Sequence, residues 1–336
     1  MSGKSKPIGA VVITHNSAGF VAACLESALK CASPVVVVDN ASTDDTCAVV
    51  SRFPSVRLLA NRHNAGFAAA ANQGFAALEN ELVLLLNPDA ILRSTIQPLE
   101  DACRAGAACA AGSLIDTEGK PQAGFMLRRF PTPATLCFEA LGLNRLWPSN
   151  PVNRRYRCLD VDTGLAQDAE QPAGAFLLIR REVWRELGGF DETFHPLWFE
   201  DVDFLLRLRQ KGHRTRFLPQ VEVLHYGAHS LAGMPGSKRV WYWYANLLHY
   251  AAKHFHWFTF REVALAVALG CAFRIPAEML RSRGFKPLFD YGKVIWLAGK
   301  ALLVGPSSCN GISKKHAVPG ANTSGTELTN SHSHGS

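Results

Sequence analysis

Apolar runs and polar stretches alternate regularly along the first part of the chain. Ile8–Thr14 and Val35–Val38 are rich in β-branched residues, and Leu82–Leu86 is a further apolar run of similar length. Such runs are typical of strands that are buried on both faces. Segments with helical spacing lie between them, notably Ala18–Lys30 and Ala68–Leu78. The pattern predicts an α/β fold in which helices flank a mostly parallel central sheet.

Polar residues follow these predicted strands. Asp39 comes directly after the second strand, Asn64 lies in the loop after the third strand (Val56–Ala60), and Asp89 follows the fourth. The carboxyl ends of parallel strands share one edge of a sheet, where open α/β proteins bind ligands. We therefore expect the three positions to converge on one site. The first strand is not followed by G-x-G-x-x-G or a Walker loop, so a dehydrogenase or P-loop enzyme is a weak interpretation.

The middle of the chain, residues 107–171, has no regular pattern and is interpreted as an insertion across the ligand-binding edge. Strand character returns at Pro172–Ile179, and a helical turn that starts at Arg181 ends at two glycines. Two further strands are predicted at Arg214–Phe217 and Val221–His225.

Two apolar segments near the C-terminus, Val263–Cys271 and Val294–Val304, are predicted to be helical, and charged residues or Pro276 interrupt them. Neither reaches the roughly 20 apolar residues that a membrane-spanning helix needs. They are interpreted either as helices lying on a membrane surface, next to the basic aromatic segment Lys238–His256, or as a helical subdomain that packs on itself. The expected division is a domain over residues 7–235, a C-terminal helical extension over 236–304, and a disordered tail over 305–336.

Composition narrows the class of protein. The chain is 48% hydrophobic and 10% aromatic, which is typical of a folded globule. Its nine cysteines form no C-x-x-C pair and are interpreted as reduced thiols of a cytoplasmic protein. The run Ile8–Ile13 is too short for a signal peptide. The net charge of +7 fits an anionic partner, but the basic residues are spread and form no nucleic-acid-binding motif, so nucleic acid is not an expected partner.

An acidic cluster, Glu200-Asp201-Val202-Asp203, follows the aromatic pair Trp198-Phe199. One interpretation is that the carboxylates open a helix and offset its dipole. The other is that a carboxylate against an apolar wall serves as a general base. Both can hold together, in which case the pKa of the base depends on the balance between helix terminus and apolar wall.

The order of these motifs resembles that of the family-2 glycosyltransferases with the GT-A fold, over residues 7–230. The motifs that carry the resemblance are Thr14-His15-Asn16, Val38-Asp39-Asn40, Asn64-Ala65-Gly66-Phe67, Asn87-Pro88-Asp89, Ala173-Gly174-Ala175, Gly189-Phe190-Asp191 and Glu200-Asp201-Val202-Asp203. The Asn-Pro-Asp and Asn-Ala-Gly-Phe forms are similar to those of the bacterial rhamnosyltransferase-like branch, which builds O-antigen and other cell-surface polysaccharides.

The resemblance implies a nucleotide-binding role for five residues. Asp39 would accept a hydrogen bond from N3–H of uracil or thymine, and Thr14 and Asn16 would line the same pocket. Asn64 and Gly66 would lie along the ribose and phosphates, where glycine permits close approach of the backbone.

The resemblance also implies a metal site. Asp89 would hold Mg²⁺ or Mn²⁺ against the diphosphate, since hard cations prefer oxygen ligands. Asn87 stands where a first aspartate is familiar and supplies only a neutral oxygen. His225 would complete the metal site, and a histidine of the core is the alternative interpretation.

In the acidic cluster, the resemblance assigns Asp201 as the base that deprotonates the acceptor hydroxyl. Glu200 and Asp203 would position the acceptor or orient the base. Trp198 would offer an apolar platform for a sugar ring, or belong to the core.

The expected activity is inverting, metal-assisted transfer of a sugar, with L-rhamnose as the first expectation. The expected donor is dTDP-rhamnose first and a UDP-sugar second. The acceptor would be a growing lipid-linked glycan at the inner face of the cytoplasmic membrane, with the enzyme cytoplasmic or peripheral at that face. The alternative is a non-catalytic nucleotide-sugar-binding or assembly subunit of the same fold, which the replacement of a carboxylate by Asn87 favours.

Overall fold

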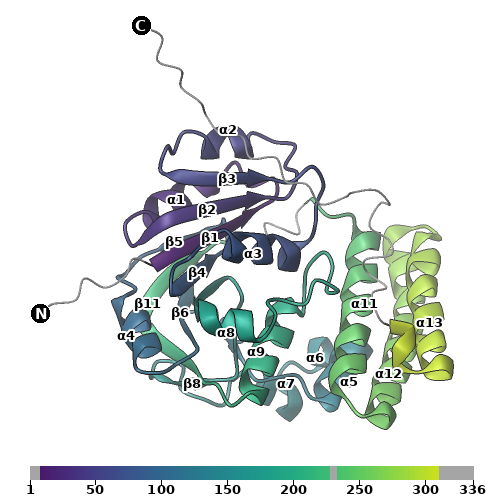
Figure 1. Cartoon of the computed structure of the whole chain (residues 1–336). Helices are drawn as coiled ribbons and strands as arrows, with labels where there is room; N and C mark the ends of the chain where they lie inside the picture. Colours follow the sequence, from purple (N-terminus) through teal and green to yellow (C-terminus); the bar gives the residue numbers. More distant parts are fainter. Residues whose placement is uncertain (1–7, 228–232, 310–336) are drawn as a thin grey trace, which may run out of the picture.

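The computed structural model describes residues 8–227 and 233–309, and the account below is limited to them. The predicted parallel sheet is present in the first half of the chain (Figure 1). Its strands lie in the order β3-β2-β1-β4 and all pair in parallel. Their bounds are β1 Ile8–Thr14, β2 Ala32–Asp39, β3 Val56–Ala60 and β4 Leu82–Leu86.

The sheet continues beyond β4 with mixed strand directions. β10 pairs antiparallel with both β4 and β6, β6 pairs in parallel with β11, and β11 pairs antiparallel with β5 and β8. A separate two-stranded sheet joins β7 to β9. The bounds are β5 Ala90–Leu92, β6 Cys109–Ile115, β7 Leu127–Arg128, β8 Gln167–Ala169, β9 Gln171–Pro172, β10 Phe176–Arg180 and β11 Thr215–His225.

Two expectations about these strands are wrong. The insertion predicted over residues 107–171 begins with β6, an interior strand of the sheet. Its sequence, Cys-Ala-Ala-Gly-Ser-Leu-Ile, is poor in the β-branched residues that marked the other strands. The two strands predicted between Arg214 and His225 are one continuous strand, β11, whose register against β6 shifts between Leu218 and Glu222.

Helices cover both faces of the sheet, as predicted for an α/β fold. α1, α2 and α4 pack against one face of the sheet, and α3, α8 and α9 against the other. Alternate residues of β1 enter the two cores, Val12 on the first face and Val11 on the second. The bounds are α1 Val21–Ala28, α2 Thr46–Val50, α3 Phe67–Ala76, α4 Gln97–Arg104, α5 Pro133–Leu141, α6 Leu143–Leu146, α7 Pro151–Tyr156, α8 Arg181–Glu186 and α9 Glu200–Gln210.

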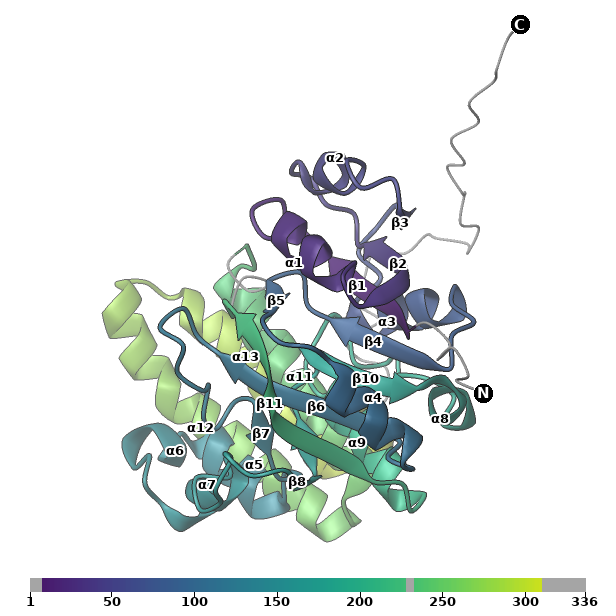
Figure 2. The ribbon, with the colours of Figure 1, turned by 90° about the vertical axis from the view of Figure 1, so that its left-hand side faces the viewer.

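The C-terminal helices form a third layer beside the sheet domain (Figures 1 and 2). α11 (Gly236–His254), α12 (Trp257–Ser282) and α13 (Lys286–Val304) share a core with α5 and with the start of α9. The predicted helical extension therefore packs on the domain by one of its faces. A 3₁₀ helix, η1 (Pro306–Cys309), follows and buries Cys309, although the tail was predicted to begin at residue 305. The rest of that predicted tail, residues 310–336, lies outside the described residues.

α12 is longer than the apolar pattern predicts, because the helix continues through Pro276 for 26 residues in all. By length and composition, it is the one described helix that is long and apolar enough to cross a bilayer. Only 33% of its most apolar stretch is buried inside the protein. The apolar run within α12 is interrupted as the sequence predicts, whereas the whole helix reaches spanning length.

Candidate active site

A cavity of about 770 Å³ opens at the carboxyl ends of β1, β4 and β11, opposite the N-terminal turns of α9 and α11. This volume lies in the range of small-molecule binding sites. The predicted site residues that line it are Thr14, Asn16, Asn64, Asn87, Asp89, Trp198, Glu200, Asp201 and His225. Asp39, Gly66 and Asp203, which were predicted to join them, do not line the cavity.

The carboxylate of Asp201 lies in the first turn of α9 and faces the cavity. Its Oδ2 accepts a hydrogen bond from the backbone N–H of Gly174 at 3.0 Å, and its Oδ1 accepts one from the N–H of Val202 at 2.8 Å. Burial raises the pKa of Asp201 above its ordinary value, although both N–H groups and the charge of Arg128 act in the opposite direction. A carboxylate with a raised pKa is a stronger proton acceptor.

Glu200 is buried beside Asp201, and its Oε2 has no hydrogen-bond partner in the described part of the chain. Burial raises the pKa of Glu200 well above its ordinary value, and the charge of Asp201 adds to the rise. Trp198 and Phe199 precede this helix with φ of 79° and 73°. Two consecutive non-glycine residues in the left-handed region store strain, a feature that concentrates at functional sites.

Asp89 and His225 line the same cavity, and Nε2 of His225 lies 3.7 Å from Oδ1 of Asp89. The amide of Gln122 donates to the backbone carbonyl of His225 at 2.7 Å, so its Oε1 is left to accept from Nδ1 of the same residue at 3.0 Å. Nδ1 therefore carries the proton, and the lone pair of Nε2 points to the cavity. Burial lowers the pKa of His225, against the charge of Asp89, which agrees with a neutral ring.

Of the nucleotide-binding residues predicted at the ends of β1 and β2, Thr14 lines the cavity and Asp39 lies behind it. Asp39 is buried behind Thr14, and its carboxylate accepts hydrogen bonds from the Thr14 hydroxyl at 2.7 Å and from the backbone N–H of Ser42 at 2.9 Å. Asp39 thus orients the Thr14 hydroxyl at the cavity wall. Direct contact between the Asp39 carboxylate and a nucleobase would require the Thr14 hydroxyl and the Ser42 N–H to turn away from it.

The loop between β3 and α3 is held in a similar way. Asn64 lines the cavity, and its Oδ1 accepts from the N–H of Gly66 at 2.9 Å. Gly66 has a φ of 88°, and a β-carbon there would lie 2.7 Å from Nδ1 of His195. Glycine is therefore required by the packing of this loop against the segment before α9.

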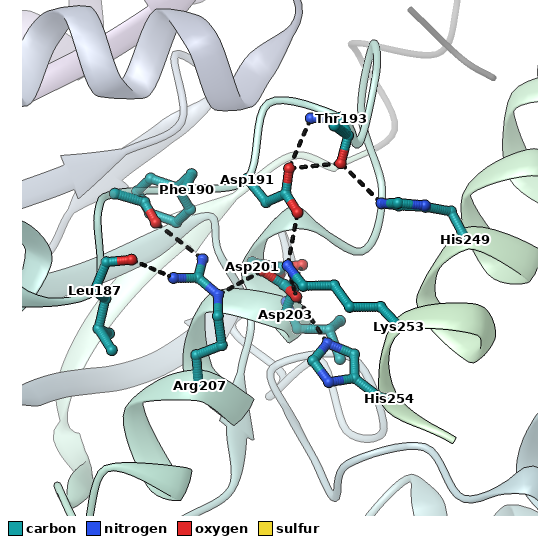
Figure 3. Close-up of polar contacts among 12 residues, drawn as sticks. Leu187, Phe190, Asp191, Thr193, Asp201, Asp203, Arg207, His249, Lys253 and His254 are labelled. Carbon is teal, nitrogen blue, oxygen red and sulfur yellow. Dashed lines mark hydrogen bonds and ion pairs between the residues drawn. The ribbon is translucent and has the colours of Figure 1, made fainter. Parts of the chain in front are cut away.

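Asp203 does not line the cavity, and its side chain points toward Arg207, Lys253 and His254 (Figure 3). Its fully buried carboxylate lies 2.8 Å from Nε of Arg207 and 2.7 Å from Nζ of Lys253. His254 contacts the same carboxylate at 2.7 Å. Burial alone would raise the pKa of Asp203, but the hydrogen bond from His254 and the charges of Arg207 and Lys253 outweigh burial and lower it. The arrangement ties α9 to α11 and favours a structural role over acceptor binding.

Comparison with known proteins identifies the family of this chain. Residues 10–186 match the profile of glycosyl transferase family 2, and residues 144–243 match that of glycosyltransferase like family 2. This chain belongs to glycosyl transferase family 2. It is 33% identical over 247 residues to the N-acetylglucosaminyl-diphospho-decaprenol L-rhamnosyltransferase of Mycobacterium tuberculosis. The aligned residues cover 66% of this chain and 76% of the relative.

A second relative of this glycosyltransferase is the rhamnosyltransferase WbbL of Escherichia coli K12. It is 26% identical over 174 residues, which are 50% of this chain and 61% of the relative. The fold is shared with GalNAc-T7, solved with UDP, GalNAc and Mn²⁺, at a TM-score of 0.50 and 15% identity. That match covers 67% of this chain and 44% of the GalNAc-T7 chain. The GT-A assignment and the resemblance to rhamnosyltransferases are thereby confirmed.

The pair Asp89 and His225 in this glycosyltransferase fits a divalent cation. Oδ1 of Asp89 is buried without a hydrogen-bond partner in the described residues, and the unprotonated Nε2 of His225 faces it. Oδ1 and Nε2 are both hydrogen-bond acceptors, so neither can satisfy the other. A donor or a cation between them would satisfy both. The described residues contain no group of three or more His, Cys, Asp or Glu that could hold a metal. A cation here would therefore need further ligands, such as the Asn87 amide or oxygens of a bound diphosphate.

Sequence reasoning missed Arg128, whose side chain enters the cavity of the enzyme from β7. Its Nε donates to the backbone carbonyl of Gly124 at 2.9 Å, and its guanidinium carbon lies 5.6 Å from the ring centres of both Phe125 and Tyr156. The two terminal nitrogens have no hydrogen-bond partner among the described residues. The side chain is thus held rigidly with four N–H donors available to an anion. Its position in the irregular region 107–171 left no pattern from which to find it.

Proposed function

We propose that this glycosyltransferase transfers a sugar, with inversion at the anomeric carbon, from a nucleotide diphosphate sugar to a lipid-linked glycan acceptor. The observation that carries the proposal is that Asp201 and the pair Asp89 and His225 line one cavity. The pair suits the charge of the leaving diphosphate, and Asp201 suits deprotonation of an acceptor hydroxyl.

Asp201 is the base in this proposal. The hydrogen bond from Gly174 orients its carboxylate at the cavity wall. The raised pKa makes this carboxylate a stronger acceptor for the proton of the acceptor hydroxyl. Glu200 lines the cavity beside Asp201, with its pKa raised by burial and by the charge of Asp201, and would position the acceptor. Trp198 lies across the same wall and offers a flat apolar face to a sugar ring.

Asp89 and His225 would hold the divalent cation, with Mn²⁺ favoured over Mg²⁺ because an imidazole nitrogen is a poor ligand for the harder ion. When bound, such a cation offsets the negative charge that develops on the departing diphosphate. Thr14, Asn16 and Asn64 would line the nucleoside side, with Asp39 behind Thr14 as the source of pyrimidine preference.

Arg128 suits the phosphate groups of a lipid-linked acceptor, because it lines the cavity with its terminal nitrogens available and its charge acts on Asp201. The M. tuberculosis relative is named for an acceptor of this chemistry, a sugar joined to decaprenol by a diphosphate, and both named relatives are rhamnosyltransferases. These names support dTDP-L-rhamnose as the first donor to test and a UDP-sugar as the second. A cytoplasmic protein acting at the inner face of the cytoplasmic membrane would meet both substrates.

The test has two stages. A thermal-shift screen of nucleotide sugars with Mn²⁺ identifies the donor, because ligand bound to the native state raises its apparent stability. Transfer from that donor to a polyprenyl-diphosphate-linked sugar is then measured with the wild type and Asp201→Asn. Stabilisation only by purine nucleotides would remove the pyrimidine assignment. Donor binding without transfer to any lipid-linked acceptor would favour a non-catalytic binding subunit instead.

A further inference from the structure

The hairpin of α12 and α13 exposes a second apolar face, opposite the face that packs in the core. We use the term hairpin surface for six of its large apolar side chains, which are between 66% and 85% exposed. They are Phe273, Leu280, Phe285, Phe289, Trp296 and Leu303. Helices of globular proteins usually carry one apolar stripe, so two apolar faces on one helix indicate a second apolar environment.

The part of this surface on α13 is a continuous row. Phe289, Trp296 and Leu303 are seven residues apart and lie along one face of the helix. The buried residues Val294 and Ala298 belong to the opposite face, which contributes to the core shared with α11 and α12. The exposed row is therefore not a displaced part of the core.

A row of lysines runs beside the apolar row. Lys286, Lys293 and Lys300 are also seven residues apart and exposed, and Nζ of Lys300 lies 5.7 Å from the ring centre of Trp296. Arg281 lies exposed at the end of α12. Residues 257–309 contain seven basic and three acidic residues. Aromatic and aliphatic side chains flanked by lysines are the pattern of helices that lie in the headgroup region of an anionic bilayer.

Other occupants of this surface fit less well. In a two-fold dimer the same patch meets itself, so the lysine rows of the two copies would face each other and repel. A transmembrane position for α12 would expose its buried polar contacts, because Nη2 of Arg274 reaches back to the carbonyl of Glu139 on α5. Binding on the surface of a bilayer satisfies the apolar and basic rows without unpacking the helix.

We propose that the hairpin surface docks this enzyme on an anionic lipid bilayer. The value of docking rests on the proposed function, because a lipid-linked acceptor stays in that bilayer. α11 connects the two sites: Lys238 and Tyr242 of its first half line the cavity, and its second half packs in the core shared with α13. A docked hairpin thus holds the cavity at a fixed place relative to the bilayer.

The experiment is co-sedimentation of the full chain with vesicles, without donor or acceptor. The vesicles are phosphatidylglycerol mixed with phosphatidylethanolamine, and phosphatidylcholine alone. The variants are the triple substitution Phe285→Ser, Phe289→Ser, Trp296→Ser and the triple substitution Lys286→Glu, Lys293→Glu, Lys300→Glu. The matched control is Leu165→Ser, which removes a 62% exposed leucine from the loop before β8.

We expect the wild type and the control to bind the anionic vesicles, and each triple variant to bind them about tenfold more weakly or worse. The replaced residues are exposed, so circular dichroism should show unchanged folding. Binding that is indifferent to both triple substitutions overturns the proposal, as does a stable dimer that leaves vesicles unbound. Transfer to a short-chain, water-soluble acceptor separates the two proposals: retained transfer without vesicle binding removes only the docking surface, and vesicle binding without transfer removes only the proposed function.

Discussion

The backbone N–H of Gly174 donates to Oδ2 of Asp201 at 3.0 Å, and a β-carbon on Gly174 would lie 2.9 Å from that same oxygen. Position 174 therefore has two functions: it supplies a donor that orients the proposed base, and it leaves the space that the base occupies. The loop before β10 thus packs directly against the first turn of α9, although the two segments are distant in the sequence.

Gly174→Ala should displace the carboxylate of Asp201 and lower kcat by about 10- to 100-fold, because small misplacements of a catalytic group are costly. Donor binding, measured by thermal shift, should stay unchanged, since the nucleoside side of the cavity is not touched. The control is Gly299→Ala on α13, where a β-carbon would have open space around it. Unchanged kcat in Gly174→Ala would show that the position of Asp201 does not limit the reaction.

Asp201→Asn should lower kcat by about 10²- to 10⁴-fold, the range that general-base catalysis supplies. The amide keeps the size of the side chain and loses its basicity, so the folded structure and donor affinity should persist. Asp168→Asn on β8, which removes an exposed ion pair with Arg216, is the control. A folded Asp201→Asn variant with wild-type turnover would assign the base to another residue.

The pH profile should report the environment of Asp201. Because burial raises its pKa, the acid limb of kcat/KM should lie above the ordinary range of an aspartate, and activity is lost as pH falls through that limb. Arg128→Gln removes a charge that lowers this pKa, so it should move the limb to higher pH. Arg128→Lys should restore the limb while still raising the KM for a diphosphate-linked acceptor, since lysine lacks the planar fork. A limb that stays in place in Arg128→Gln would contradict the assignment.

Gln122 should affect metal affinity without touching the metal. Its amide fixes the ring of His225 with Nε2 unprotonated, and loss of such a partner typically costs about 10- to 100-fold in metal affinity. Gln122→Ala should raise the Mn²⁺ concentration for half-maximal activity by that factor, with kcat largely recovered at saturating metal. Gln97→Ala, an exposed glutamine on α4, is the control. Equal Mn²⁺ dependence in both variants would mean that His225 does not contribute to a metal site.

The sequence predicts much of the fold because apolar strand runs and strand-end polar residues are local signals. β1, β3 and β4 have the predicted bounds, and nine of the twelve predicted site residues line the cavity. β6 was missed because its small residues gain their strand conformation from neighbours in the sheet. Gln122 and Arg128 were missed because no periodic pattern marks them. The tertiary fold brings Arg128 to the cavity and Gln122 to the ring of His225.

Asp203 is a different case, since the spacing already contained the answer. Two residues along an α-helix turn the side chain by about 200°, so Asp201 and Asp203 cannot face the same cavity. In the acidic motif, Glu200 and Asp201 therefore line the cavity, and Asp203 lies on the buried side of α9. The burial of Asp39 behind Thr14, in contrast, depends on the register in which β1 and β2 pair, which sets Thr14 beside Asp39, and spacing along the sequence does not give that register.

Asp203→Asn should destabilise the protein by about 3 kcal/mol, because it removes the buried counter-charge of Arg207 and leaves Lys253 with Asp191 alone. The folded-state pKa of Asp203 is lowered, so its contribution is present above the unfolded-state value of about 4 and is lost as pH falls through the lower folded-state value. Urea unfolding at several pH values should therefore show a smaller loss of stability below about pH 4 in the variant than in the wild type. A control is Asp160→Asn, whose ion pair with Arg129 lies at the surface and should contribute less than about 1 kcal/mol. If Asp203→Asn is as stable as this control and kcat falls instead, Asp203 acts on the reaction and not on the packing of α9 against α11.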